Sequence, residues 1–375
     1  MNVLVVGEYF STNLGDGVIC ETVQKLIEKY FKKEFSINQI DILDISGEKE
    51  FSFVNNIELG KTSFKSKLLK ILPSETQKKI ILNHRDANIC YTITFDEYDL
   101  VIFAGGQLLM EHFTLQINRI LEICKDKEIP VIYNSLGFRE PNSAFIEKQI
   151  VKNLTHESVK RITVRDHEHA VKTRTNKEVS YVPDNALLSG KVFDIVSSDS
   201  ECIGLGIMYF KEKEALLDEF WKNIIEILEQ KRIKWKFFVN GSNYDYQYAK
   251  KLAAKFGFLP SQSIERPESP KELISVIAQF GKIISFRLHS HIIAYSLQIP
   301  SIALTWDKKL EYFFDSIDHS EALFDFENTP VETILEALDN AVYGASDLEK
   351  LEEAQEKILC NMKENLLICK VGDNN

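Results

Sequence analysis

The sequence predicts an α/β protein made of two doubly wound, Rossmann-like domains that face each other across a cleft. Its 375 residues exceed what a single hydrophobic core usually serves. Short runs that are apolar throughout alternate with amphipathic helical stretches, which is typical of parallel sheets covered on both faces. The alternation stops at a polar stretch, residues 196–201, and then starts again. We therefore expect a hinge at this stretch and a second domain after it.

Apolar runs in the first half of the chain predict five strands. They cover residues 3–6, 100–103, 130–133, 161–164 and 179–182. Helical spacing of apolar residues predicts helices over residues 19–31 and 115–124. The first of these helices should bury one face, formed by Ile19, Val23, Leu26, Ile27 and Tyr30.

The second half of the chain repeats this pattern. Strands are expected at residues 202–208, 234–239, 282–286 and 301–304, and helices at 214–230, 246–256, 271–279 and 291–297. Two further helices are expected at residues 332–342 and 348–367. The sequence thus predicts an N-terminal domain (1–195), a C-terminal domain (202–345) and a final segment (346–375) whose helix packs back across both domains.

Composition and charge restrict the function. The chain has 45 Lys+Arg against 56 Asp+Glu, a net charge of -11, which argues against nucleic-acid binding. An anionic substrate would need a local cluster of Arg, Lys or helix N-termini. The six cysteines form no close C-x-x-C pair, which favours free thiols in a reducing compartment. Because the start is not leader-like and no apolar run approaches the ~20 residues that span a bilayer, we expect a cytoplasmic protein, free or at the inner face of the membrane.

One segment, at about residues 60–85, is strongly basic. Its charged residues are Lys61, Lys65, Lys67, Lys70, Lys78, Lys79 and Arg85, against a single acid, Glu75. Apolar residues lie between them at helical spacing. Such an insertion is either a solvated surface helix or a basic amphipathic patch that makes peripheral contact with anionic lipid or an anionic glycan.

The loop after the first strand contains Asn13, Gly15 and Asp16. In a doubly wound sheet, ligands bind at the carboxyl ends of the strands. Gly15 would let the backbone come close to a ligand, and Asp16 would accept a hydrogen bond from a sugar hydroxyl. The alternative is that Asp16 only caps a helix that begins near Val18.

Two further strand ends in the first half hold candidate site residues. Gly105 and Gly106 follow the strand at 100–103 and suit either a substrate-facing loop or a plain tight turn. Arg165 follows the strand at 161–164. It is either a substrate-binding group or the partner of Asp166 or Asp184 in a structural ion pair.

The most informative junction lies at residues 285–290. A strand ends there and a helix begins at about Ser290, so Arg287 and His289 should be exposed beside the N–H groups of the new helix, as in an anion site. Arg287 can form paired hydrogen bonds with a carboxylate or phosphate, and His289 can move a proton near neutral pH. Lys308, after the next strand, adds a cation at the same edge.

Taken in order, these features resemble the polysaccharide pyruvyl transferase family. The resemblance rests on residues 13–16, 105–106, 131–137, 164–166, 183–184 and 285–289, the last followed by a strand at 300–304. It implies a GT-B-type fold and transfer of an enolpyruvyl-derived unit from phosphoenolpyruvate to sugar hydroxyls, forming a pyruvate ketal. The acceptor would be a surface glycan or its lipid-linked precursor, and no cofactor or metal ion is implied.

The resemblance also suggests roles for the candidate residues. The N-terminal domain would be the acceptor side and the C-terminal domain would bind the donor. His289 would be the general acid and Asp16 a catalytic group on the acceptor side. The expected substrate-binding residues are Asn13, Gly15, Gly105, Gly106, Arg165, Arg287, Ser290 and Lys308. Two other functions stay open: a GT-B glycosyltransferase that uses a nucleotide sugar, and a non-catalytic glycan-binding relative.

Overall fold

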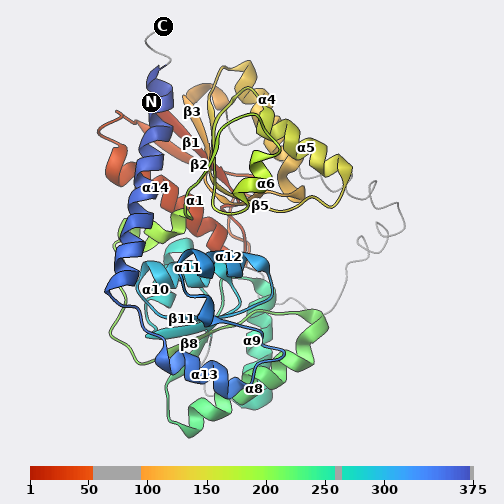
Figure 1. The fold of residues 1–375 in the computed structure, drawn as a ribbon, viewed down its shortest axis with the longest axis vertical. Coiled ribbons are helices and arrows are strands. Elements are labelled where there is room, and N and C mark those ends of the chain that lie inside the picture. The colour runs from red at the N-terminus through yellow and green to blue at the C-terminus, as the bar shows by residue number, and fades with distance from the viewer. Residues whose placement is uncertain (54–93, 258–263, 372–375) are drawn as a thin grey trace.

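The computed structural model describes residues 1–53, 94–257 and 264–371. They form two α/β units stacked along the long axis of the molecule (Figure 1). The basic segment at residues 60–85, and with it both of its interpretations, falls outside the described residues. Within the described ranges, no helix combines the length and the apolar character needed to cross a membrane.

The first unit is built on a seven-stranded parallel sheet. In spatial order its strands are β2 (Gln39–Asp44), β1 (Asn2–Gly7), β3 (Leu100–Phe103), β5 (Val131–Phe138), β6 (Val159–Val164) and β7 (Val179–Tyr181), while β4 (Gly106–Leu109) pairs with β5 off this path. From β1 the chain passes to one side for β2 and to the other side for β3, so the switch point lies between β1 and β3. Ligands of doubly wound sheets bind outside the strand ends at this point.

The second unit is built on a five-stranded parallel sheet. In spatial order its strands are β12 (Leu323–Phe324), β11 (Ser301–Leu304), β10 (Lys282–Ser285), β8 (Ile203–Gly206) and β9 (Trp235–Phe238). Here the switch point lies between β8 and β10. The loop after β10 therefore borders the switch point of the second sheet, as the loop after β1 borders that of the first.

α-Helices connect the strands of both units. In the first unit they are α1 (Leu14–Leu26), α4 (Thr114–Asp126), α5 (Ala144–Thr155), α6 (Glu168–Lys172) and α7 (Ser189–Phe193). In the second they are α8 (Glu214–Gln230), α9 (Asn243–Phe256), α10 (Pro270–Ile277), α11 (Leu288–Ser296), α12 (Lys308–Ser316) and α13 (Val331–Asn340). The last helix is α14 (Ala345–Val371).

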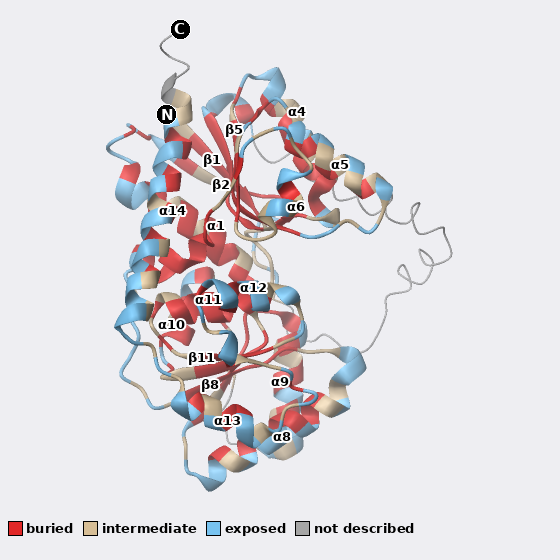
Figure 2. Ribbon diagram, in the orientation of Figure 1, coloured by how far each residue is buried: buried red, intermediate tan, exposed pale blue. Residues whose placement is uncertain are grey.

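One apolar core continues from the first unit into the second. Val18 and Ile19 of α1 belong to the same buried cluster as Ile274 of α10 and Ile292 of α11. Figure 2 shows these buried helices meeting between the two sheets. A separate cluster fills the other face of the first sheet, beneath α4 and α5. The units are therefore joined by apolar packing, and a side chain at their boundary can be held from both sides.

Helix α14 contacts both units. Near its start, the Asp347 carboxylate lies 2.7 Å from Nε2 of His319 in the second unit. Towards its end, the amides of Asn361 and Asn365 donate hydrogen bonds of 2.7 and 3.0 Å to Oδ1 of the buried Asn134 in β5. The position of the hinge, at residues 196–201, stays a prediction.

Two element boundaries differ from the prediction in ways that matter for packing. The first helix ends in a π-helical turn, η1 (Ile27–Phe31), whose wider turn buries Phe31 and leaves Tyr30 40% exposed. The expectation that Tyr30 lies on the buried face is therefore wrong. Helix α11 begins at Leu288, two residues before the expected start at Ser290. Strands β2 and β4 and helices α5 and α12 were not expected from the sequence.

Candidate active site

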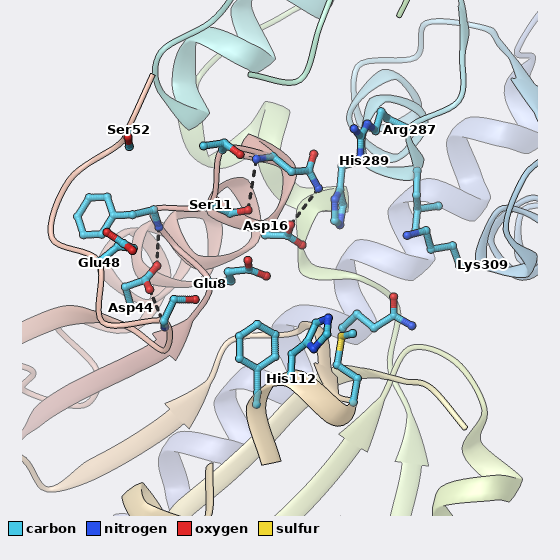
Figure 3. A pocket seen from close by; sticks show the side chains of 18 of the residues that line it. Glu8, Ser11, Asp16, Asp44, Glu48, Ser52, His112, Arg287, His289 and Lys309 are labelled. Carbon is cyan, nitrogen blue, oxygen red and sulfur yellow. Dashed lines mark hydrogen bonds between the residues drawn. The ribbon is translucent and has the colours of Figure 1, made fainter. Parts of the chain in front are cut away.

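A cavity of about 580 Å³ opens between the two units at their switch points (Figure 3). Its lining residues lie within 8–16, 44–52, 107–113 and 165 of the first unit, and within 287–289 and 306–309 of the second. This volume falls in the range of cavities that bind small ligands. The loops after β1 and β10 thus both contribute to a single site.

His289 is the second residue of α11 and is only 6% exposed. Its ring packs directly against the backbone of Gly15 in α1: a β-carbon added at Gly15 would lie 2.5 Å from Cγ of His289 and closer still to Nδ1. Gly15 therefore leaves space for the imidazole. The expectation of an exposed His289 is wrong, because the first unit covers the ring on the side away from the cavity.

Arg165 forms the structural ion pair and also lies at the cavity, while substrate binding by Arg165 stays a prediction. Its guanidinium forms an ion pair with Asp184, lies 3.6 Å from Asp166 and also lines the cavity. Nη1 of Arg165 is 3.4 Å from Nε2 of His289, and Asp184 is 4.0 Å from the same nitrogen. Because a guanidinium only donates hydrogen bonds, Nε2 of His289 is the acceptor in this contact.

Burial lowers the pKa of His289 below its usual value. The negative charges of Asp16 and Asp184 oppose this effect, while the positive charges of Arg165 and Lys309 add to it. The imidazole is therefore neutral near pH 7 in the unliganded cavity. In this state it can take up a proton, and the role of general acid stays a prediction.

Arg287 occupies the N-cap position of α11 and lines the cavity. Its Nε and Nη2 donate hydrogen bonds of 3.1 and 2.5 Å to Oδ2 of Asp245, which is 1% exposed. Part of the donor set expected for a substrate is thus used within the protein. Asp245 lies in α9, far away in sequence, and sequence reasoning missed it.

Lys309, and not Lys308, faces the cavity. Helix α12 starts at Lys308, and the side chain of Asp307 caps it by accepting a hydrogen bond of 3.1 Å from the N–H of Lys309. The same carboxylate is 4.0 Å from the Lys309 ammonium, whose pKa is lowered by burial. Lys308 is exposed and lines a neighbouring cavity. Asp307, a typical N-cap residue, is the signal that could have predicted this helix.

Asn13 and Asp16 both line the cavity, and Nδ2 of Asn13 donates a hydrogen bond of 2.9 Å to Oδ2 of Asp16. Helix α1 begins at Leu14, four residues before the expected start at Val18. Asp16 therefore lies inside the first turn and is not the N-cap residue. The N–H of Leu14 donates a hydrogen bond of 2.8 Å to the carbonyl of Asn240, which ties the start of α1 to the second unit.

Three other expected site residues lie behind the cavity wall. Gly105 and Gly106 have φ angles of 126° and 74°, and Gly106 begins β4. A β-carbon at Gly106 would lie 3.8 Å from Oδ1 of Asp16, so this glycine borders the Asp16 side chain. Ser290 is buried, and its hydroxyl donates to Oδ1 of Asn240 at 2.9 Å. These residues support the wall and do not line it.

The wall opposite Arg287 and Lys309 is acidic. It contains Glu8, Asp44 and Glu48 (Figure 3). Burial raises the pKa of Asp44 to about 6, although its carboxylate accepts backbone N–H bonds, among them one of 2.6 Å from Phe10. Sequence reasoning missed this wall because β2, which carries Asp44, mixes charged and apolar residues. Within the described part of the chain, no group of three or more His, Cys, Asp or Glu side chains could hold a metal ion.

Comparison of the sequence with known protein families gives a match over most of the chain. The sequence model of the family described as Polysaccharide pyruvyl transferase matches residues 13–308. No curated protein sequence matches the chain.

Three solved structures show the same architecture. A UDP-N-acetylglucosamine 2-epimerase is 12% identical, with a TM-score of 0.52 over 100% of this chain and 98% of that chain. The UDP-GlcNAc 2-epimerase of Methanocaldococcus jannaschii is 12% identical, with a TM-score of 0.51 over 92% and 94%. S. aureus MnaA, in a co-structure with UDP, is 9% identical, with a TM-score of 0.51 over 96% and 92%. At these identities the likeness shows the fold alone, a GT-B-type pair of Rossmann-like units.

Proposed function

Because the chain belongs to the polysaccharide pyruvyl transferase family and is therefore a transferase, we propose that it transfers the pyruvyl unit of phosphoenolpyruvate to two hydroxyls of a sugar. The products are a pyruvate ketal and inorganic phosphate. The acceptor is a surface glycan or its lipid-linked precursor, modified in the cytoplasm or at the inner face of the membrane.

The observation that carries the proposal is the basic wall of the cavity, where Arg287 and Lys309 meet the N-terminus of α11. Among the described residues, the carboxylate nearest to the Lys309 ammonium is that of Asp307, at 4.0 Å, so this cation can approach a ligand. The first turn of α11 lines the same cavity and contains no acidic residue, and helix N-termini attract anions through their N–H groups. An acidic protein thus presents a local site suited to a phosphate and a carboxylate.

The proposed reaction needs one acid and one base. A first sugar hydroxyl adds to C2 of phosphoenolpyruvate while C3 takes up a proton and becomes a methyl group. Phosphate then leaves with the C–O bonding electrons, and the second hydroxyl adds to C2 to close the ketal. Of the two hydroxyl protons released, one balances the proton given to C3 and the other leaves with phosphate.

We assign the proton to C3 to His289. Burial keeps its imidazole neutral in the unliganded cavity. A bound anion beside the ring favours the imidazolium form. Donor binding would therefore protonate the ring of His289, which then holds the proton that the reaction consumes. Proton transfer by a positioned side chain contributes about 10²–10⁴-fold, and we expect His289→Gln to lower kcat by that order. We assign a hydroxyl proton to Asp16 on the opposite unit.

The acidic wall fits the acceptor. Ionised carboxylates accept hydrogen bonds from sugar hydroxyls and repel a second anion. Glu8 and Glu48 therefore favour a hydroxyl-rich ligand at their end of the cavity and leave the donor to the basic wall. This separation would orient the two substrates before reaction.

Thermal unfolding with phosphoenolpyruvate, UDP or inorganic phosphate tests the donor. At 100 times its Kd, a specific ligand adds about 2.7 kcal/mol of stability, which we expect for phosphoenolpyruvate. At the same concentration, Lys309→Ala should reduce this effect to about 0.4–1.4 kcal/mol, as expected for a 10–100-fold weaker Kd, while Lys308→Ala, the matched control one residue away, should keep it. Phosphate release with sugar acceptors, and mass spectrometry of the product, then test the transfer. Stabilisation by UDP alone would indicate a nucleotide-sugar glycosyltransferase, and no effect of any donor would indicate a glycan-binding relative.

A further inference from the structure

A second cavity, of about 460 Å³, adjoins the active-site cavity. The two share Gln107 and Lys309 as lining residues. The second cavity is also formed by both units, with Arg139 on one side and Asp307 on the other. Figure 1 shows α6 and α12, which flank this region, on opposite sides of the boundary between the units. The space next to the reacting groups therefore continues past Lys309.

Several charged residues of this second cavity are paired within the protein, whereas Lys308 and Lys309 add two cations to its lining. Arg139 and Asp307 lie 3.3 Å apart across the boundary between the units. His167 lies 3.0 Å from Asp166, and Glu140 lies 2.7 Å from Arg174. Paired groups have little charge left for a phosphate but keep oriented donors and acceptors. Such oriented groups, with the ammonium groups of Lys308 and Lys309 as further donors, suit a ligand that is rich in hydroxyl groups.

An aromatic ring completes this wall. Tyr312 of α12 is 41% exposed and lines the second cavity. Its ring centroid is 4.7 Å from that of His167, which comes from the other unit. His167 has a φ of 50°, a conformation that is strained for a residue other than glycine, and its Nδ1 is held by Asp166. The ring is thus braced from both units while one part of it is open to solvent.

We propose that this second cavity is a saccharide subsite, which holds the sugar next to the one that receives the pyruvyl unit, with Tyr312 as its stacking platform. The inference rests on the proposed function and extends it to the form of the acceptor. The C–H face of a pyranose packs on an exposed aromatic ring, while the polar wall bonds its hydroxyls. The enzyme then prefers an oligosaccharide to a single sugar.

Paired acceptors test this preference. The probes are p-nitrophenyl glycosides of galactose, glucose, mannose, N-acetylglucosamine and N-acetylmannosamine, each beside a disaccharide glycoside with the same terminal sugar. The readout is the ratio of kcat/KM for the disaccharide to that for the monosaccharide, with phosphate release from phosphoenolpyruvate as the signal. We expect Tyr312→Ala to lower this ratio about tenfold, equivalent to about 1.4 kcal/mol. Tyr312→Phe should keep the ratio, because the ring remains.

The matched control is Tyr30→Ala, since Tyr30 is 40% exposed in η1 and should not affect the ratio. Saturation-transfer NMR with the same disaccharides measures binding without turnover. Disaccharide binding that depends on Tyr312 in a protein that releases no phosphate would keep the subsite and reject the pyruvyl transfer. A ratio unchanged by Tyr312→Ala, or NMR signals that are equal in wild type and variant, would overturn the subsite and leave the transfer reaction standing.

Discussion

Replacing Gly15 by alanine tests how closely the site must fit. The change adds one methyl group to the first turn of α1, at the point where the ring of His289 packs on the backbone. The new β-carbon would lie 2.5 Å from Cγ of His289, whereas ordinary contacts between such atoms begin at about 3.4 Å. The ring or the start of α1 must therefore move by about 1 Å.

A displacement of this size is costly for a proton-transfer group. Misplacing a reacting group by about 1 Å can reduce the rate about 10²-fold, which corresponds to about 2.7 kcal/mol of transition-state energy. We expect Gly15→Ala to lower kcat by this factor, with a smaller effect on the KM for phosphoenolpyruvate, because Lys309 is not displaced. Overpacking costs about 1–3 kcal/mol of stability, and the better helix propensity of alanine offsets up to about 1 kcal/mol.

Steady-state phosphate release and urea unfolding measure the two effects. Gly344→Ala is the matched control, because its β-carbon would meet nothing closer than Oδ2 of Asp347 at 3.9 Å. A double-mutant cycle with His289→Gly gives the sharper test. If Gly15 acts only through His289, adding Gly15→Ala to His289→Gly should cause no further loss. A Gly15→Ala enzyme within threefold of wild-type activity would refute the reasoning.

Three further predictions concern charge, positioning and pH. Lys309→Ala should raise the KM for phosphoenolpyruvate about 10–100-fold, the value of a hydrogen bond to a charged group, and titration of binding at two salt concentrations checks it. The buried Ser135 (φ 54°) hydrogen-bonds, at 2.8 Å, the carbonyl just before Asp184, so Ser135→Ala should lower kcat more than it raises KM and should shift the pH profile of kcat/KM. Ser135→Gly relieves the strain of the positive φ angle but also lacks the hydroxyl, so it should behave in the same way. Recovery of kcat in that variant would contradict a positioning role for the hydroxyl. Burial lowers the pKa of His291 to about 4, below its unfolded value, so its contribution to stability is present above pH 6.5 and is lost as the pH falls towards 4. We expect urea unfolding of His291→Gln to show about 3 kcal/mol less acid destabilisation than wild type between pH 7 and 4.

The regular elements follow from local patterns and were largely predictable. Helix α8 matches the expected residues 214–230, and β3 and β11 match their predicted ranges. In each of these segments the pattern of apolar residues is complete within a few turns or residues, so the element can be recognised without a distant partner. Strand β2 was missed because an edge strand with polar residues lacks a continuous apolar run.

The choice between Lys308 and Lys309 shows where local patterns stop being sufficient. Successive residues of a helix point about 100° apart, so the phase of the helix decides which of two neighbours faces a ligand. That phase depends on the first helical residue, which here is set by the cap at Asp307. Without the helix, the two lysines are equivalent in sequence.

Contacts between segments that are distant in the chain could not be predicted from the sequence. Gly15 was expected to approach a substrate, yet its open side is filled by His289. Arg287 was expected to be free, yet Asp245 holds it. In both cases the residue's partner comes from an element that only the fold brings near.

The protonation of His289 follows from the same arrangement. Its ring belongs to the second unit, but Gly15, Asp184 and Arg165 of the first unit surround it. Burial, the main cause of its lowered pKa, therefore exists only while the two units are in contact. The shared apolar core between α1 and α11 maintains that contact. The lowered pKa of His289 is thus a property of the interface and not of either unit alone.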